Sequence, residues 1–267
     1  MRLTYVSVLR DLVATRALLT TEDADAFLRS CGAPAGKHRL RTRNRALAAL
    51  CATGELVRIQ RGLYARGRPD CAPDPYSVAS WLAPDAVLGL CSALEVHGVI
   101  APRGGRCIYF TRLDDAGRGP VWHGKRMQRI SHPVPLLREG KEFVETTLVE
   151  ARAGGRMRVS TIERAFVDVM DRPRLTGDWP AILQMLDAIP ALDLDRVVHY
   201  VGCLRNATTA AKTGWFLERR RDQLDVTAVT LCRLEQMRPR SPHYLSRSQR
   251  ISGRYATRWN LVVPPHL

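Results

Sequence analysis

The sequence lacks any Cys-x-x-Cys pair and any hydrophobic run long enough to span a membrane. Its seven cysteines are scattered, and this odd number of unpaired positions argues against a disulfide framework or a zinc site and indicates reduced thiols. Arg10 and Asp11 interrupt the only apolar stretch near the N-terminus, so no signal peptide is expected. These absences favour a cytoplasmic protein without a bound metal.

The sequence also lacks the usual catalytic motifs: it has no phosphate-binding loop, no zinc-protease helix and no nucleophile elbow. Gly104-Gly105 followed by Asp114-Asp115 faintly matches a nucleotidyltransferase signature, but adjacent aspartates on a strand would point to opposite faces. We therefore expect no enzymatic activity, no catalytic residue and no cofactor. A magnesium-dependent, restriction-type nuclease remains an alternative, although no Glu-x-Lys is present. Its candidate residues would be Lys141, Glu142, Glu145 and Glu150.

Acidic residues are scarce, with 26 Asp/Glu against 41 Lys/Arg and a formal net charge of +15. Residues 1–68 hold thirteen Lys/Arg and five Asp/Glu, a net charge of +8, whereas the other 199 residues have a net charge of +7. The positive excess per residue is therefore roughly threefold denser in the first quarter of the chain. Such a distribution favours an acidic partner, and it places the contact near the N-terminus.

One segment near the N-terminus combines the charge with a recognisable order of elements. Residues 36–45 read Gly-Lys-His-Arg-Leu-Arg-Thr-Arg-Asn-Arg, contain no acid, and lead into the apolar stretch 46–50. A strand-like stretch at 55–59, a turn at 60–62 and a second short strand at 63–65 follow directly. A basic helix followed by a two-stranded wing is typical of winged helix-turn-helix domains that bind DNA.

Helical spacing assigns roles within this segment. Leu40, Leu47, Leu50 and Cys51 gather on one side of the predicted helix. On the opposite side, four residues are expected to enter the major groove: His38, Arg41, Thr42 and Arg45. Four more are expected to hold the DNA backbone or extend the base contacts: Lys37, Arg39, Arg43 and Asn44. Three wing residues are expected to touch phosphate or the adjacent minor groove: Arg58, Arg61 and Tyr64.

The chain divides into two predicted domains. Helices at 4–15 and 20–30, the second opened by a Thr20–Asp23 capping box, precede the basic helix and complete a winged helix-turn-helix domain over 1–68. The Pro-rich stretch 69–76 reads as a linker. Residues 77–267 then form an α/β effector domain within an overall α+β fold. Its predicted helices are 77–82, 92–97, 161–170, 178–189, 193–201, 208–222 and 226–237, and its predicted strands are 107–111, 127–130, 143–149, 157–160 and 255–263.

Five motifs, in this order, carry a resemblance to a known family. They are Arg61-Gly-Leu-Tyr64, Ser92-Ala-Leu-Glu-Val-His-Gly-Val99, Val159-Ser-Thr-Ile-Glu-Arg-Ala-Phe-Val-Asp168 with Asp171-Arg-Pro173, Ala211-Lys-Thr-Gly-Trp-Phe-Leu-Glu218, and Arg258-Trp-Asn-Leu-Val-Val-Pro264. Together they resemble the AbiEi family of type IV antitoxins over nearly the whole chain. The resemblance implies an N-terminal winged helix that represses its own operon. It also implies a C-terminal domain that counters a nucleotidyltransferase-like toxin encoded next to it.

Within these motifs, four residues are candidates for a surface that faces the toxin: Glu163, Arg164, Asp168 and Lys212. The structural alternative is that Arg164 and Asp168, four residues apart, pair with each other and pin the helix N-terminus to the sheet. Trp215, Phe216 and Leu217 are expected to belong to the core rather than to a stacking platform.

The sequence therefore predicts an autoregulatory repressor that binds double-stranded DNA at its own promoter, acts as the antitoxin of its operon and forms a possible dimer on inverted repeats. Neutralising about five phosphates would give a log–log salt slope of roughly −4 to −5. The leading alternative is a protein-interaction module whose basic face meets an acidic protein instead of DNA.

Overall fold

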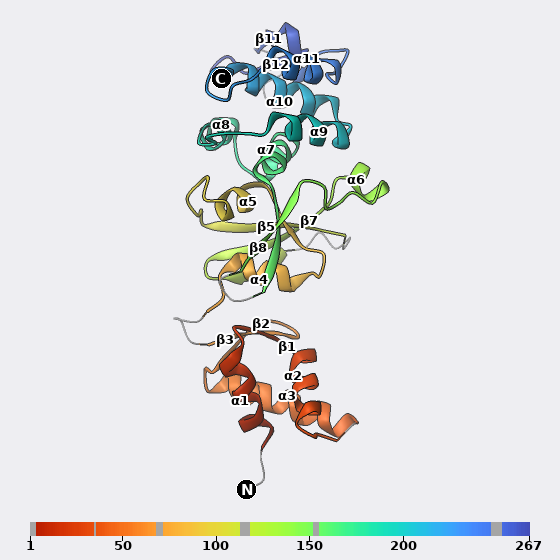
Figure 1. Cartoon of the computed structure of the whole chain (residues 1–267). Helices are drawn as coiled ribbons and strands as arrows, with labels where there is room; N and C mark the ends of the chain where they lie inside the picture. Colours follow the sequence, from red (N-terminus) through yellow and green to blue (C-terminus); the bar gives the residue numbers. More distant parts are fainter. Residues whose placement is uncertain (1–3, 35, 68–71, 113–117, 152–154, 247–252) are drawn as a thin grey trace.

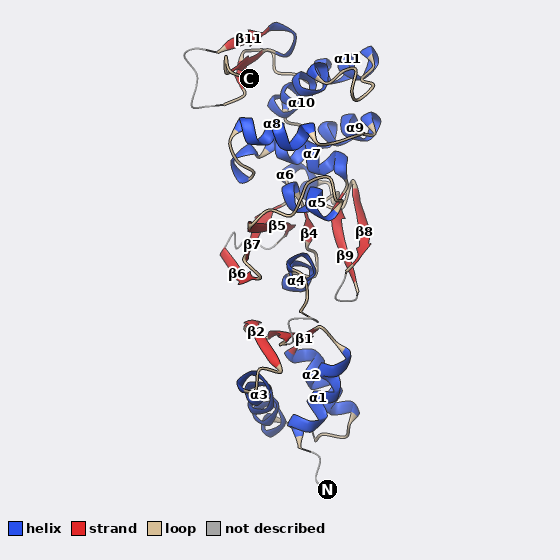
Figure 2. Cartoon of the chain, turned by 90° about the vertical axis from the view of Figure 1, so that its left-hand side faces the viewer, coloured by secondary structure: helices blue, strands red, loops and turns tan. Residues whose placement is uncertain are grey.

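The computed structural model describes residues 4–34, 36–67, 72–112, 118–151, 155–246 and 253–267. The fold is α+β, as the sequence predicts. Figures 1 and 2 show the elements stacked along one direction, with the N-terminal helices at one end and the C-terminal elements at the other. Asp114-Asp115 lies outside the described residues. Among the described residues, no helix combines the length and the apolar character needed to cross a bilayer.

The N-terminal part consists of three helices and a three-stranded sheet. In chain order its elements are α1 (Tyr5–Thr15), β1 (Leu18–Thr20), α2 (Thr21–Ser30), α3 (Lys37–Ala52), β2 (Leu56–Gln60) and β3 (Leu63–Arg66). The three strands form an antiparallel sheet in the order β1-β3-β2. β2 and β3 are the predicted wing, and β1 adds a third strand that the sequence analysis did not anticipate.

Local signals place the ends of α2. Thr20 accepts a hydrogen bond from the Asp23 amide, and the Asp23 carboxylate accepts one from the Thr20 amide, so the predicted capping box is confirmed. At the other end Gly32 adopts a φ of +82°, and the amide of Ala33 reaches back to the carbonyl of Leu28. This left-handed turn stops α2 and redirects the chain into α3.

The small sheet has two buried faces. Leu19, Leu56 and Tyr64 pack with the three N-terminal helices in one hydrophobic cluster. Leu63 and Ala65 belong instead to the large cluster that fills the rest of the molecule. Because successive side chains of a strand point to opposite faces, β3 contributes to both cores at once. The wing therefore joins the N-terminal helices to the body, and β2 lies against β6.

The body is built on a mixed six-stranded sheet in the order β6-β7-β5-β4-β9-β8. β5 and β7 pair in parallel, as do β4 and β9, and the other neighbours are antiparallel. The strands are β4 (Val87–Leu88), β5 (Gly105–Thr111), β6 (Arg118–Trp122), β7 (Lys125–Ser131), β8 (Thr146–Glu150) and β9 (Arg156–Ser160).

Helices cover both faces of this sheet (Figure 2). α4 (Pro75–Leu82) packs on the face toward the N-terminal part, and α5 (Leu90–Val96) and α7 (Ile162–Asp171) pack on the other face. α6 (Val134–Arg138) follows β7 and contacts α9. Beyond α7 lie α8 (Trp179–Asp187), α9 (Leu194–Leu204), α10 (Ala207–Arg219) and α11 (Ala228–Gln236). These helices confirm the predicted helical character of the last third.

The C-terminal segment differs from its prediction. The alternation over 255–263 predicts one strand, but the structure has β11 (Arg254–Ala256), a 3-10 turn (Thr257–Trp259) and β12 (Leu261–Val263). β11 and β12 pair antiparallel, and β10 (His243–Tyr244) pairs with β12. Asn260 adopts a left-handed φ of +48°, which reverses the chain within the apparent alternation.

Other boundaries also shift. The predicted strand at 143–149 begins only at Thr146, after a turn, and β4, β6 and α6 were not anticipated. Residues 69–71 of the predicted linker lie outside the described residues, and its end at Pro75 and Tyr76 forms the first turn of α4. Asp74 caps that turn and proline occupies its first position, a combination that favours helix initiation.

Candidate nucleic-acid interface

The outward face of α3 carries the cations that the sequence predicts. Lys37, Arg41 and Arg45 are exposed, and none of them has a hydrogen-bond or ion-pair partner among the residues that the structure describes. Arg41 and Arg45 are four residues apart, so they lie on one side of the helix. Ala46, Leu47 and Leu50 are buried against α1 and α2 and fix which side faces out.

Arg39 and Arg43 have a different role from the one predicted. The Arg39 guanidinium donates to both carboxylate oxygens of Asp25 on α2, at 3.0 and 3.1 Å. Arg43 lies 3.7 Å from the same carboxylate. The three side chains are only 11–15% exposed. Both arginines lie on the inner face of α3, where they hold α3 against α2. They are therefore not among the cations that face outward.

Arg39 and Arg43 face inward because the buried side of α3 is rotated relative to the predicted one. The prediction put Leu40 on the buried side, but Leu40 is 40% exposed. The buried side instead follows the i, i+4 row from Arg39 through Arg43 to Leu47. The long arginine stems pack within the N-terminal part while their charged ends reach Asp25.

Two further residues predicted to contact DNA make hydrogen bonds within α3 instead. The Asn44 side-chain oxygen accepts hydrogen bonds from the Arg43 guanidinium at 2.9 and 3.1 Å. The Thr42 hydroxyl donates to the carbonyl of His38 at 3.0 Å, one turn back. Bidentate recognition of adenine by Asn44 requires that oxygen to leave Arg43. His38 is exposed on the same side as Arg41 and Arg45.

The wing turn lies next to the junction of β1 and α2. Gly62 adopts a φ of +84°, and its carbonyl accepts a hydrogen bond from the amide of Thr21 at 3.0 Å. The carbonyl of Thr21 in turn accepts a hydrogen bond from Arg43 at 3.3 Å. Thr21 therefore connects the wing turn to the middle of α3. Arg61 is exposed in that turn, and Arg58 is exposed on β2, where its guanidinium donates to the carbonyl of Gln60 at 3.4 Å. Tyr64 is half-buried against the N-terminal core.

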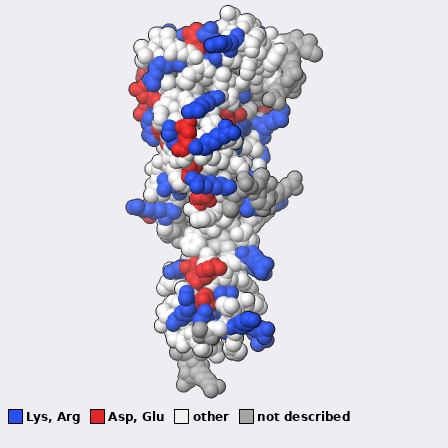
Figure 3. Space-filling model, turned by 90° about the vertical axis from the view of Figure 1, so that its right-hand side faces the viewer, with Lys and Arg blue, Asp and Glu red and all other residues white. Residues whose placement is uncertain are grey.

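The exposed cations of the N-terminal part fall into two groups. Three of them pair with a carboxylate: Arg10 with Glu55 and Arg16 with Asp23, each at 2.8 Å, and Arg29 with Asp25 at 3.7 Å. Five cations have no carboxylate partner among the described residues: Lys37, Arg41, Arg45, Arg58 and Arg61. Figure 3 shows Lys and Arg at the edges of this end of the molecule, with acidic side chains gathered between them. The unpaired group is the part of the surface suited to phosphate.

The predicted toxin-facing residues do not form a surface. Arg164 and Asp168 are completely buried, and Glu163 and Lys212 are 8% and 7% exposed. Arg164 lies 3.4 Å from Asp168 and donates to the carbonyls of Glu142 and Val144 at 2.8 and 2.7 Å. Arg164 and Asp168 therefore cannot meet a partner directly in the folded chain. The predicted i, i+4 pair that pins α7 to the sheet is what the structure contains.

Further groups complete this buried network. The Tyr200 hydroxyl donates to Asp168 at 2.7 Å, and the Arg164 guanidinium lies over the Phe110 and Tyr200 rings. Burial raises the pKa of Asp168 to about 6, although Arg164 opposes the shift. His132 stacks on Phe110, and its pKa falls to about 4 because of burial and, secondly, Arg164. The network joins α7, α9 and the sheet.

The residues of the nuclease alternative are each engaged in an ion pair. Glu142 pairs with Arg112, Glu145 with Arg196, Glu150 with Arg156, and Lys141 with Glu139. Glu142 and Glu145 lie in the segment before β8 and not on neighbouring strands. Within the described ranges no cluster of His, Cys, Asp and Glu has the arrangement needed to hold a metal ion. The geometry gives no support to a paired-carboxylate site.

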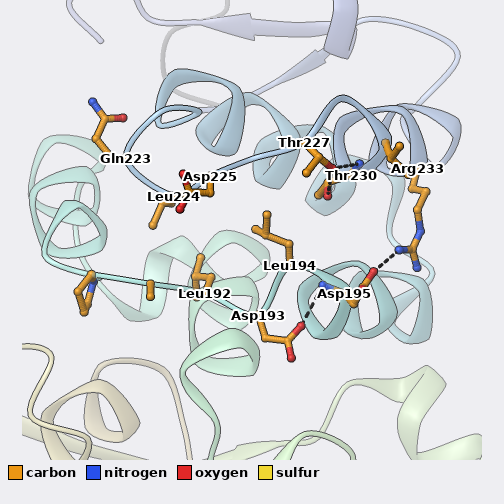
Figure 4. A pocket seen from close by; sticks show the side chains of 13 residues that line it. Leu192, Asp193, Leu194, Asp195, Gln223, Leu224, Asp225, Thr227, Thr230 and Arg233 are labelled. Carbon is orange, nitrogen blue, oxygen red and sulfur yellow. Dashed lines mark hydrogen bonds and ion pairs between the residues drawn. The ribbon is translucent and has the colours of Figure 1, made fainter.

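A groove at the far end of the molecule has the opposite charge character. It lies between the residues preceding α9 and the start of α11, and its volume is about 470 Å³. Figure 4 shows Asp193, Asp195 and Asp225 around it, with Arg233 reaching Asp195 at 2.5 Å. Asp193 caps α9 by accepting from two backbone amides. These carboxylates make the groove unsuited to nucleic acid.

Comparison with known proteins supports the fold. No family model matches the sequence, and no curated protein matches it. The structure is similar to the crystal structure of the RV2827C protein from Mycobacterium tuberculosis, with a TM-score of 0.62 and 20% sequence identity. The match covers 97% of this chain and 91% of that one. It shows that the fold recurs in another chain over nearly the whole length of this one.

Sequence reasoning missed Asp25 and Thr21, the two residues that position the interface. Asp25 lies fourteen residues before Arg39, and Thr21 acts through backbone atoms that carry no sequence signal. Asp25 does carry one local signal, because it lies four residues before Arg29 on α2 and pairs with it at 3.7 Å.

Proposed function

We propose that this protein is a DNA-binding autoregulator whose α3 enters the major groove while its wing contacts the adjacent backbone. The observation that carries the proposal is the set of five outward cations without a carboxylate partner among the described residues, on α3 and on the wing that Thr21 joins to it. The proposal is supported by three helices with a three-stranded sheet, an arrangement compatible with a winged helix-turn-helix, which places its recognition helix in the groove.

Within this group the residues have separable tasks. Arg41 and Arg45 are on one side of α3, and an arginine fork can donate to the O6 and N7 atoms of guanine. His38 extends the same side toward the helix N-terminus. Lys37, Arg58 and Arg61 lie at the helix start and on the wing, where phosphate contacts set the register of the protein on the duplex. Arg39 and Arg43 support α3 from behind through Asp25.

The test is binding to the DNA upstream of the gene, measured by fluorescence anisotropy against scrambled DNA of equal length over a salt series. We expect preferential binding to the upstream DNA and a log–log salt slope of roughly −3, at about 0.9 for each of the three cations directed at phosphate. Equal affinity for both duplexes would overturn sequence-specific regulation and favour the alternative of a basic protein-interaction module.

We further propose that the chain acts as the antitoxin of its operon, against a nucleotidyltransferase-like toxin. The resemblance of its five motifs to the AbiEi family supports this role, and neutralisation is assigned to residues 77–267. The buried state of Arg164 and Asp168 implies that they support the fold of that part and do not touch the toxin. Coexpression with the neighbouring gene should restore growth, and Arg41→Gln with Arg45→Gln should leave the rescue intact. Failure of the full chain to restore growth would overturn the antitoxin role.

A further inference from the structure

A large cleft in the body is lined by two of the sequence motifs that the DNA-binding proposal does not use. Its volume is about 860 Å³, and it lies between the turn after α7 and the first half of α10. Asp171-Arg-Pro173 forms one wall, and Lys212 of α10 forms part of the floor. The motifs are about forty residues apart in the sequence, yet they meet at one cavity within the size range of small-molecule sites.

Three cations line the cleft, and the deepest of them is nearly buried. Lys212 is 7% exposed, and its ammonium lies 3.2 Å from the carbonyl of Met170 and 5.4 Å from the centre of the Trp179 ring. Arg172 is oriented by a 2.7 Å hydrogen bond to the carbonyl of Ser131. Arg174 is exposed at the rim and makes no hydrogen bond or ion pair with the residues described.

The carboxylates of the cleft are already engaged. Asp171 accepts hydrogen bonds from Asn206 and Thr209, at 2.8 and 2.6 Å, and lies 3.6 Å from Arg172. Asp178 accepts from the amide of Ala181 and so caps α8. Among the described residues that line the cleft, three are cations and two are carboxylates, and both carboxylates serve internal partners. This lining favours an anionic ligand over a cation.

Flat and apolar side chains form the remaining walls. Trp179 and Tyr244 bring aromatic rings to the cleft, and Pro173, Leu175 and Leu245 add apolar surface. An inorganic anion would use only the cations. A ligand that joins phosphate to a planar ring would use both kinds of lining, since aromatic side chains stack on nucleobases.

We propose that this cleft binds a nucleotide, with the phosphates at Lys212, Arg172 and Arg174 and the base against Tyr244, next to the nearly buried Trp179. This site is separate from the DNA-binding surface, because α3 and the wing are at the opposite end of the molecule (Figure 1). The proposal therefore stands or falls independently of the proposed regulation of transcription.

The experiment is isothermal titration calorimetry of the full chain with ATP, GTP, pyrophosphate and adenosine. Two variants test the cleft: Lys212→Met, which keeps the aliphatic stem, and Arg174→Gln, which changes an exposed side chain and spares the fold. Two controls remove positive charge elsewhere, namely Arg41→Gln with Arg45→Gln on α3 and Arg221→Gln on the surface of the body.

We expect one molecule of ATP or GTP per chain, and affinity at least about tenfold lower in each cleft variant, because each loses a charged contact with phosphate. The controls should bind as the unmodified chain does. Absence of binding at millimolar nucleotide, or loss of binding only in the α3 control, would overturn the proposal. Pyrophosphate binding as tight as ATP would overturn the role of the aromatic walls. Should Lys212→Met not fold, Arg174→Gln decides the outcome.

Discussion

Asp25 accepts two hydrogen bonds from Arg39 across the turn that separates α2 from α3. The pair is mostly shielded from solvent, and Arg43 approaches the same carboxylate from one turn further along α3. One acid thus fixes the inner face of the most basic helix in the chain. The outer face owes its direction to this contact as well as to the apolar residues behind it.

Replacing Asp25 by Asn should destabilise the N-terminal part and weaken DNA binding together. Two mostly buried guanidinium groups would lose their counter-charge, and hydrogen bonds to charged groups are worth about 1.5–3 kcal/mol. Urea unfolding followed by circular dichroism measures the loss. Asp11→Asn is the matched control, since Asp11 is exposed on α1. Equal stability of the two variants would show that Asp25 does not position α3.

Arg41→Ala combined with Arg45→Ala should remove most of the preference for the upstream DNA. Each base or phosphate contact is worth about 1–3 kcal/mol, so the double variant should bind the specific duplex at least about tenfold more weakly. The control is Arg221→Ala with Arg240→Ala, which removes the same charge from exposed positions in the body. An unchanged operator affinity in the α3 variant would rule out α3 as the recognition helix.

Wing arginines should contribute affinity without sequence preference. Arg58→Gln with Arg61→Gln removes two exposed cations from β2 and its turn. We expect the magnitude of the salt slope to fall by about 1.8, at about 0.9 for each phosphate contact, with little change in the ratio of specific to scrambled DNA. Anisotropy titrations at four salt concentrations give both quantities. A lost ratio with an unchanged slope would mean that the wing reads bases and not phosphate.

His132 and Asp168 in the buried network should change the stability of the body in opposite directions as the pH falls. Removing Asp168 should leave the effect of His132 alone. The pKa of His132 is lowered to about 4, so its contribution to stability is present above its unfolded pKa near 6.5 and is lost as the pH falls toward 4. The pKa of Asp168 is raised to about 6, so its contribution is lost as the pH rises from about 4 to 6. The two contributions have opposite signs over the same window.

Asp168→Asn should therefore make the protein more sensitive to acid than the unmodified chain, by up to about 3 kcal/mol between pH 6.5 and 4, because the opposing contribution of Asp168 is gone. The same change leaves Arg164 without its carboxylate and should lower stability at neutral pH by about 3–5 kcal/mol. Urea midpoints at pH 6.5 and 4.5 provide the comparison. Parallel midpoint shifts in the variant and the unmodified chain would contradict the shifted pKa values.

Leu63 belongs to the core of the body although it lies on the wing, so its truncation should affect the molecule as a whole. Leu63→Ala should cost about 2–5 kcal/mol. Differential scanning calorimetry should show one transition that shifts to lower temperature. Two transitions, of which only the first moves, would show that the N-terminal helices unfold independently of the body.

The elements that the sequence predicted were those with strong local signals. The capping box of α2, the basic α3, the β2–β3 wing and the helices of the last third follow from spacing, caps and turn residues. β1 and β4 were not predicted, because strands of two or three residues are too short to show an alternating pattern. The last strand was wrong because a left-handed Asn260 reverses a stretch whose alternation looked continuous.

The candidate site was predictable in its charge but not in its partners. Arg41 and Arg45 face outward as helical spacing indicated, whereas Arg39 and Arg43 turn inward because of Asp25, which is distant in sequence. The complete burial of Arg164 was the feature hardest to predict, because arginines usually lie at the surface. Arg164 is buried because two backbone carbonyls, a carboxylate and aromatic rings surround it. Contacts of this kind depend on the tertiary fold and leave no local pattern.

The alternating burial of β3 limits how this chain can tolerate insertions. One added residue in the wing turn would exchange the two faces of the strand, sending Leu63 and Ala65 toward the N-terminal helices and Tyr64 toward the body. One insertion would therefore disrupt the packing of both cores. The turn between α2 and α3 does not contribute to two cores in this way. Length variation among natural relatives should therefore accumulate there and spare the four residues from Leu63 to Arg66.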